Sequence, residues 1–123
     1  MKNKVFGELA FDTGWKSKTT IKFFGNTCSI VLKVRAYFEE DGITAEQEQA
    51  YCDYMANKED KLICMERLLN VYPDAAIRFV PRTLLFERDG ACALLCDDND
   101  EPDEGIAVCL SPVEQILSQD DYL

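Results

Sequence analysis

Hydrophobic and polar residues alternate over three segments in the first third of the chain. Alternation is clearest over residues 28–38, where almost every second residue is apolar, and it recurs over residues 5–11 and 18–24. Strict alternation is typical of a strand with one buried face, so we expect antiparallel strands here. Gly25-Asn26 tolerates the positive φ angles of a two-residue hairpin turn between the last two strands. Four cations of these strands are expected to share one solvent face: Lys18, Lys22, Lys33 and Arg35.

The middle of the chain has the periodicity of a helix. Thr44, with Gln47 three residues later, forms a capping-box pattern, in which each side chain bonds the backbone N–H of the other residue. Apolar residues then recur at spacings of three and four, and the helix ends before Pro73. A continuous helix over residues 45–71 would be about 40 Å long, so we expect a kink near Asn57. The expected buried stripe is Tyr51, Met55, Leu62, Met65 and Leu69, with Lys58 in the gap.

The last third returns to strand patterns. Residues 83–87 and 91–96 flank Arg88-Asp89-Gly90, whose Asp-Gly pair is a strong hairpin signal. An acidic loop then precedes a strand over residues 105–110. The fold class predicted is α+β in one domain spanning residues 1–123. Its antiparallel sheet has about six strands in the order βββ-α-βββ, with one long or kinked helix across one face.

Charge is the most informative bulk property. The 123 residues include 23 acids, 13 bases and no histidine, which gives a net charge of −10 at pH 7. Residues 1–38 carry a net charge of +5, whereas residues 89–123 contain ten acids and no base. This distribution argues against direct nucleic-acid binding, which needs a basic footprint, and favours a basic protein partner. Solubility of an ordinary acidic protein is the plainer explanation of the same charge.

Six cysteines raise the question of disulfides or metal. None of the spacings is that of a zinc knuckle or redox dithiol, so we expect reduced, largely buried thiols. The acidic loop lacks the glycine and glutamate positions of an EF-hand, and we expect neither a metal nor a cofactor. The apolar runs are too short to cross a membrane. The first residues lead into an alternating segment rather than an apolar signal core, and we therefore expect a cytoplasmic protein.

One short motif suggests catalysis. Asp12-Thr13-Gly14, after the apolar strand residues 9–11, resembles the active-site signature of aspartic proteases. The resemblance implies a homodimeric hydrolase in which two Asp12 carboxylates share a proton. The bulky Trp15 follows, where that family usually has serine or alanine. Asp, Thr and Gly are also favoured in turns for conformational reasons. Histidine, a phosphate loop and a nucleophile elbow are all missing from the sequence, so we expect no enzyme.

Several motifs together carry a second resemblance. The Gly14-Trp15 turn, the helix start at residues 44–47, the segment 104–108 and the ending Gln119-Asp120-Asp121-Tyr122-Leu123 resemble a group of small bacterial domains of unknown function. Small acidic α+β proteins also occur as immunity proteins, which neutralise toxins used between competing bacteria. The resemblance implies a binding protein and no catalytic residue. An uncharacterised structural or regulatory domain is the remaining alternative.

The site expected from these arguments is an acidic surface that binds a basic protein, such as a cognate toxin. Its carboxylates supply steering and rim contacts, and an aromatic residue supplies a buried anchor. Trp15 is expected either to cap the sheet or to act as such an anchor. The candidate partner-binding residues are Asp97, Asp98, Asp100, Glu101, Asp103, Glu104, Asp120, Asp121, Trp15 and Tyr122.

Overall fold

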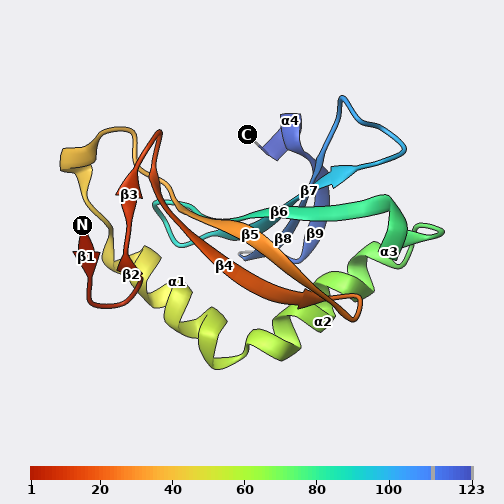
Figure 1. The fold of residues 1–123 in the computed structure, drawn as a ribbon, viewed down its shortest axis with the longest axis horizontal. Coiled ribbons are helices and arrows are strands. Elements are labelled where there is room, and N and C mark those ends of the chain that lie inside the picture. Colours follow the sequence, from red (N-terminus) through yellow and green to blue (C-terminus); the bar gives the residue numbers. More distant parts are fainter. Residues whose placement is uncertain (112, 123) are drawn as a thin grey trace.

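The computed structural model describes residues 1–111 and 113–122. One seven-stranded sheet has the order β3-β4-β5-β6-β7-β8-β9, and two consecutive helices, α1 and α2, run across one of its faces (Figure 1). A separate hairpin of β1 and β2 lies beside the sheet. The strands are β1 Lys2–Asn3, β2 Gly7–Glu8, β3 Ala10–Phe11, β4 Trp15–Phe23, β5 Asn26–Val34, β6 Phe79–Phe86, β7 Cys92–Asp98, β8 Ile106–Ser111 and β9 Gln115–Ser118. The helices are η1 Glu39–Asp41, α1 Ala45–Ala56, α2 Lys58–Leu69, α3 Ala75–Arg78 and α4 Gln119–Tyr122.

The α+β class and the mostly antiparallel sheet are confirmed, but the strand count is not. The main sheet has seven strands rather than about six, because β9 adds an edge strand beside β8. The two halves of the sheet join through β5 and β6, which pair in parallel from Val31↔Thr83 to Val34↔Phe86. The intervening helices carry the chain back to the end where β5 began, and such a crossover makes the joined strands parallel.

The hairpin of β4 and β5 differs by one residue from the prediction. Phe23 pairs with Asn26, so the two-residue turn is Phe24-Gly25 rather than Gly25-Asn26. Both turn residues have positive φ, 50° and 79°, as a type I′ turn requires. The register places three of the four predicted cations, Lys18, Lys22 and Lys33, on one face, with Lys18 opposite Val31 and Lys22 opposite Thr27. Lys16, which lies opposite Lys33, belongs to the same face, and the fourth predicted cation, Arg35, follows β5 and pairs with Glu87. These side chains point away from the helices.

The helical region is broken where the sequence predicts a kink. α1 ends at Ala56, α2 begins at Lys58, and Asn57 between them has φ −127° and ψ 30°. The predicted capping box is confirmed, because the Thr44 Oγ1 accepts from the Gln47 N–H and the Gln47 Oε1 accepts from the Thr44 N–H. The predicted stripe is wrong at Met55, which is 49% exposed. The break at Asn57 resets the helix direction, and the buried face of α1 runs through Gln47 and Tyr54 instead.

The main core lies between the two helices and the sheet. Its largest fully buried side chains come from both layers and include Phe86, Leu84, Leu94, Met65 and Leu69. A smaller apolar cluster on the other face of the sheet contains Ala93, Ala107 and Cys109, covered in part by Leu117 and Tyr122. Within the described residues, no helix has the length and apolar character that a membrane crossing needs.

Candidate functional site

The structure brings the predicted acidic loop and the acidic carboxyl-terminal segment together. The loop connects β7 to β8, and α4 begins at its base, where the Gln119 N–H donates to the Gly105 carbonyl at 2.9 Å. The Gln119 side chain also donates to the Cys96 carbonyl at 3.0 Å. Asp120 and Asp121 follow directly, so both groups of predicted carboxylates belong to one end of the β7–β9 sheet portion (Figure 1).

Asp98 is not part of the exposed surface, which corrects its predicted role. Its side chain is 4% exposed and accepts two hydrogen bonds from the Arg78 guanidinium, at 2.8 and 3.0 Å. It also accepts the Asp100 N–H at 3.0 Å. The hydrogen bonds from Arg78 lower the pKa of the Asp98 carboxyl, against the opposing effect of burial. Asp98 therefore anchors the loop from within.

Two more carboxylates of the loop form ion pairs with arginines that lie outside residues 89–123, the segment that contains ten acids and no base. Asp97 pairs with Arg82 at 2.7 Å, and Asp100 lies 3.4 Å from Arg78. Both arginines come from α3 and β6, outside the base-free segment. The remaining exposed carboxylates have no ion pair among the described residues and form what we call the acidic end: Glu101, Asp103, Glu104, Asp120 and Asp121.

The two predicted aromatic anchors lie in different surroundings. Trp15 is 4% exposed, and its ring meets the ring of Phe11 edge-on at 5.1 Å. It thus caps the core, the first of its two predicted roles, and its ring is not available on the surface. Tyr122 is half-buried over the small cluster on the far face of the sheet. Burial raises the pKa of its hydroxyl, which has no hydrogen-bond partner within the described residues.

Asp12-Thr13-Gly14 forms the turn between β3 and β4. Thr13 and Gly14 have φ of 56° and 133°, and the Asp12 N–H donates to the Gly14 carbonyl at 2.8 Å. The Asp12 carboxylate is exposed and lies 3.8 Å from the Lys16 ammonium. The conformational preferences of a tight turn are sufficient to explain these three residues.

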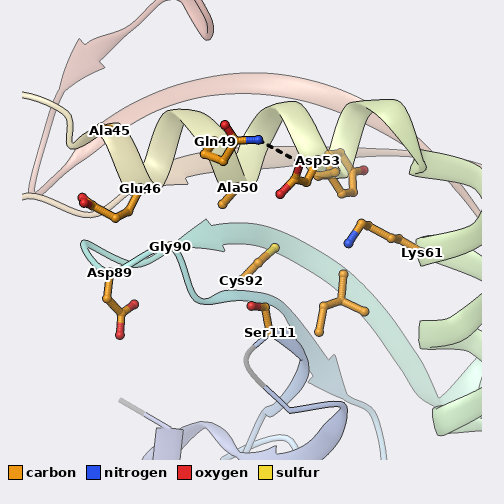
Figure 2. Close-up of a pocket in the computed structure, with 12 residues that line it drawn as sticks. Ala45, Glu46, Gln49, Ala50, Asp53, Lys61, Asp89, Gly90, Cys92 and Ser111 are labelled. Atoms are coloured by element: carbon orange, nitrogen blue, oxygen red, sulfur yellow. Dashed lines mark hydrogen bonds between the residues drawn. The ribbon is translucent and has the colours of Figure 1, made fainter.

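A groove that the sequence did not predict lies between α1 and the hairpin of β6 and β7 (Figure 2). Its volume is about 510 Å³, which is within the range of small-molecule sites, roughly 300–1,000 Å³. Cys92 and Ser111 of the sheet lie below α1, with Gly90 of the hairpin at one end. The polar and charged residues of the lining are Glu46, Gln49, Asp53, Tyr54, Lys61, Asp89 and Ser111.

One end of this groove is held rigidly by contacts between the hairpin and the start of α1. The Thr44 hydroxyl donates to the Arg88 carbonyl at 2.7 Å, and the Arg88 guanidinium donates to the Gly42 carbonyl at 2.7 Å. Gly90 has φ +92°, and a Cβ placed on it would lie 3.0 Å from the Glu46 carbonyl oxygen. Glycine is therefore required here both by the backbone angle and by the close approach.

Most charged residues of the groove are acidic, and its floor on the sheet includes the apolar side chains of Cys92 and Leu110. Three carboxylates, Glu46, Asp53 and Asp89, line the groove with one cation, Lys61, and none of the three has an ion pair among the residues that the structure describes. Burial raises the pKa of the Cys92 thiol to about 12, so the thiol beneath the groove is neutral at pH 7. The groove escaped sequence analysis because its residues come from separate elements, none of which carries a recognisable motif.

The thiols and the acidic side chains can be placed individually. All six cysteines are free, with Cys52 exposed and Cys92, Cys96 and Cys109 buried. In residues 1–111 and 113–122, no group of three cysteine, aspartate or glutamate side chains is arranged to hold a metal ion.

Comparison of the chain with protein-family models, with curated proteins and with solved structures gave no match.

Proposed function

We propose that the protein is a non-enzymatic, cytoplasmic binding module that engages a basic protein through the acidic end, and that in its most concrete form it is an immunity protein that blocks a toxin. The observation that carries this proposal is the set of exposed carboxylates at one end of the sheet. Carboxylates without cationic neighbours set up a negative potential, which speeds the encounter with a positively charged surface.

The way in which the loop is held supports a binding role. Asp98 is buried in a two-bond contact with Arg78, which fixes the loop to α3 and leaves Glu101, Asp103 and Glu104 exposed. A loop ordered before binding loses less conformational entropy when the partner docks, and this favours affinity. Tyr122 follows the two α4 aspartates, but its ring packs over Ala93, Ala107 and Cys109, so it holds α4 on the sheet and is not counted in the acidic end.

The experiment is comparative affinity capture from the native host. The wild-type chain is immobilised beside a variant in which the loop carboxylates are neutralised, Glu101→Gln, Asp103→Asn and Glu104→Gln. A matched control removes three exposed charges elsewhere: Glu39→Gln, Glu40→Gln and Glu59→Gln. We expect the wild type and the control to retain a basic protein that is released by salt and that the loop variant loses.

The genomic neighbourhood gives a second criterion. An immunity protein is expected to be encoded beside its toxin, so the product of the adjacent open reading frame is the first partner to test by the same three-way comparison. Equal retention of that protein by the loop variant and the wild type would contradict the assignment of the acidic end. Retention of no basic protein by any of the three forms would contradict the proposed function.

A further inference from the structure

Two large aromatic side chains are exposed on the turn that follows β5. Tyr37 is 75% exposed and Phe38 is 64% exposed. In the sequence, Phe38 continues the alternating apolar face of residues 28–38, and that pattern predicts a buried ring. In the structure, Ala36 is the last buried residue of this face, and the backbone then turns into η1, which leaves Phe38 in water. We call residues 36–42 the aromatic turn.

The aromatic turn is held in place by one side chain of the hairpin of β6 and β7. The Arg88 guanidinium donates to the Gly42 carbonyl at 2.7 Å and to the Asp41 carbonyl at 3.2 Å. It also donates to the Arg35 carbonyl at 3.2 Å, just before the turn. Within the turn, the Phe38 N–H donates to the Asp41 carboxylate at 2.9 Å. The backbone is therefore fixed, although the two aromatic side chains contact little of the protein itself.

The surroundings of the two rings are acidic. Glu39, Glu40 and Asp41 follow directly and are exposed, and none of the three carboxylates has an ion pair among the described residues. Aromatic residues surrounded by a polar or charged rim are typical of protein–protein interfaces. A rim of this sign is complementary to a basic partner, and it opposes a second copy of this chain, whose net charge is −10.

The aromatic turn and the acidic end lie on the same side of the molecule. Figure 1 shows the turn after β5, α4 and the loop after β7 on the side of the sheet away from α1 and α2. Tyr37 and Tyr122 of α4 line one hollow of about 340 Å³, so the turn borders the element that carries Asp120 and Asp121. One partner can therefore contact both regions.

We propose that Tyr37 and Phe38 are the anchor residues that hold the basic protein partner once the acidic end has brought it into contact. This inference rests on the proposed function and adds to it the part of the surface that slows dissociation. The acidic end supplies carboxylates and no aromatic ring. Aromatic side chains that enter desolvated pockets of a partner commonly carry much of the binding free energy, and a fixed backbone reduces the entropy lost on docking. The partner is accordingly a protein whose basic surface surrounds an apolar pocket.

The test measures how fast the basic protein recovered by affinity capture, once identified and purified, dissociates from variants of this chain. Tyr37→Ala/Phe38→Ala is compared with Met55→Ala/Ile63→Ala, which truncates two half-exposed apolar residues on the helices. In biolayer interferometry, we expect the first variant to release the partner about 30-fold faster, with an association rate within about twofold of the wild type. The second variant is expected to behave like the wild type. Equal dissociation rates for the two variants would overturn the inference and leave the proposed function intact.

Variants of the acidic residues separate the two surfaces. Neutralising Glu101, Asp103 and Glu104 is expected to slow association, whereas truncating the aromatic turn is expected to speed dissociation. The three-charge control removes Glu39 and Glu40 from the rim but keeps both rings, and we expect it to release the partner at the wild-type rate, because rim charges contribute little. Retention of no basic protein by the wild type would overturn this inference together with the proposed function.

Arg88→Lys tests whether the fixed backbone of the turn matters, because lysine keeps the charge but lacks the planar fork that bonds several carbonyls at once. We expect dissociation to be about fivefold faster in the otherwise wild-type chain, since the turn is then ordered only on docking. In the Tyr37→Ala/Phe38→Ala background, the same change is expected to have almost no further effect. An equal effect of Arg88→Lys in both backgrounds would overturn the role given to the fixed turn.

A measurement without the partner tests the exposure on which the inference depends. Because both rings lie largely in water, Tyr37→Ala/Phe38→Ala is expected to keep its thermal midpoint within about 3 °C of the wild type. A fall of about 10 °C or more would show that the rings pack against their own protein and would overturn the inference whether or not a partner binds.

Discussion

Neighbouring aspartates in the acidic loop differ in what they contribute. Asp98 is buried against Arg78, whereas Asp97 and its partner Arg82 are more than half exposed. Removing one partner of a buried charge pair leaves the other charge desolvated, but exposed pairs contribute little because water and salt screen them. The sequence alone shows two adjacent aspartates and cannot rank them, because burial depends on the arginines of α3 and β6.

Asp98→Asn is therefore expected to lower the free energy of unfolding by about 2 kcal/mol at pH 7, the size of a hydrogen bond to a charged group. The pKa of Asp98 is lower in the folded state than in the unfolded state, so this stability is present above the unfolded pKa. It is lost as the pH falls through the folded pKa, and the wild type and variant converge in acid. Urea unfolding between pH 7 and pH 2 measures both effects.

Asp97→Asn serves as the control, since it makes the same chemical change one residue away in an exposed pair. Its free energy of unfolding is expected to stay within about 0.5 kcal/mol of the wild type. A loss in Asp97→Asn equal to that in Asp98→Asn would contradict the assignment of Asp98 as the internal anchor of the loop.

Gln47 shows how one buried polar residue joins three segments. Its side chain is fully buried, accepts the Thr44 N–H at 2.9 Å, and donates to the Arg35 and Phe86 carbonyls at 2.8 and 3.2 Å. The capping box was predictable from sequence, because Thr and Gln at that spacing are a local signal. The two bonds to the sheet were not, because they depend on where α1 packs.

Gln47→Met keeps the volume of the side chain and removes all three of its side-chain hydrogen bonds. We expect a loss of about 2 kcal/mol in the free energy of unfolding, because the Thr44 N–H is left without its partner. Gln49→Met on the exposed side of α1 is the matched control and is expected to change stability by less than about 0.5 kcal/mol. Comparable losses in the two variants would contradict the role given to Gln47.

At the scale of elements, the hairpin of β6 and β7 owes its position to Gly90. Gly90→Ala forces a Cβ into the Glu46 carbonyl in addition to the strain of positive φ, whereas Gly25→Ala adds only the strain, because open space surrounds Gly25. We expect both variants to be destabilised, and Gly90→Ala by about 1 kcal/mol more than Gly25→Ala. Thermal or urea unfolding of the two variants side by side checks the difference. Equal losses in the free energy of unfolding would contradict a close contact between Gly90 and the Glu46 carbonyl of α1.

The elements that the sequence predicted are those with local signals. Alternation identified β4 and β5, and the Asp-Gly turn signal identified the hairpin of β6 and β7. β8 was expected after the acidic loop, and the break between α1 and α2 followed from excessive helix length. β9, with the four residues Gln115–Ser118, is too short for a periodic pattern to be visible. The first half of β6 was missed because Pro81 ordinarily ends a strand; here it lies next to a register shift that accommodates it.

At the scale of the whole molecule, charge is separated between two parts of the sheet. Lys16, Lys18 and Lys33 lie together on β4 and β5, away from the helices, and the unpaired carboxylates lie beyond β7 and on α4. The sequence predicted this separation from the charge count. It overestimated the free negative charge, because Arg78 and Arg82 fold back onto three of the loop aspartates. The groove could not be predicted, since only the packing of α1 against the hairpin creates it.

The rate at which the basic partner associates with the acidic end tests the central claim most directly. Stopped-flow association is measured for the wild type, for Glu101→Gln/Asp103→Asn/Glu104→Gln and for the three-charge control, at several salt concentrations. We predict that the association rate constant falls with salt and is about tenfold lower in the loop variant at low salt, with a smaller change in the dissociation rate. Identical association rates in the loop variant and the control, with no dependence on salt, would contradict recognition through the acidic end.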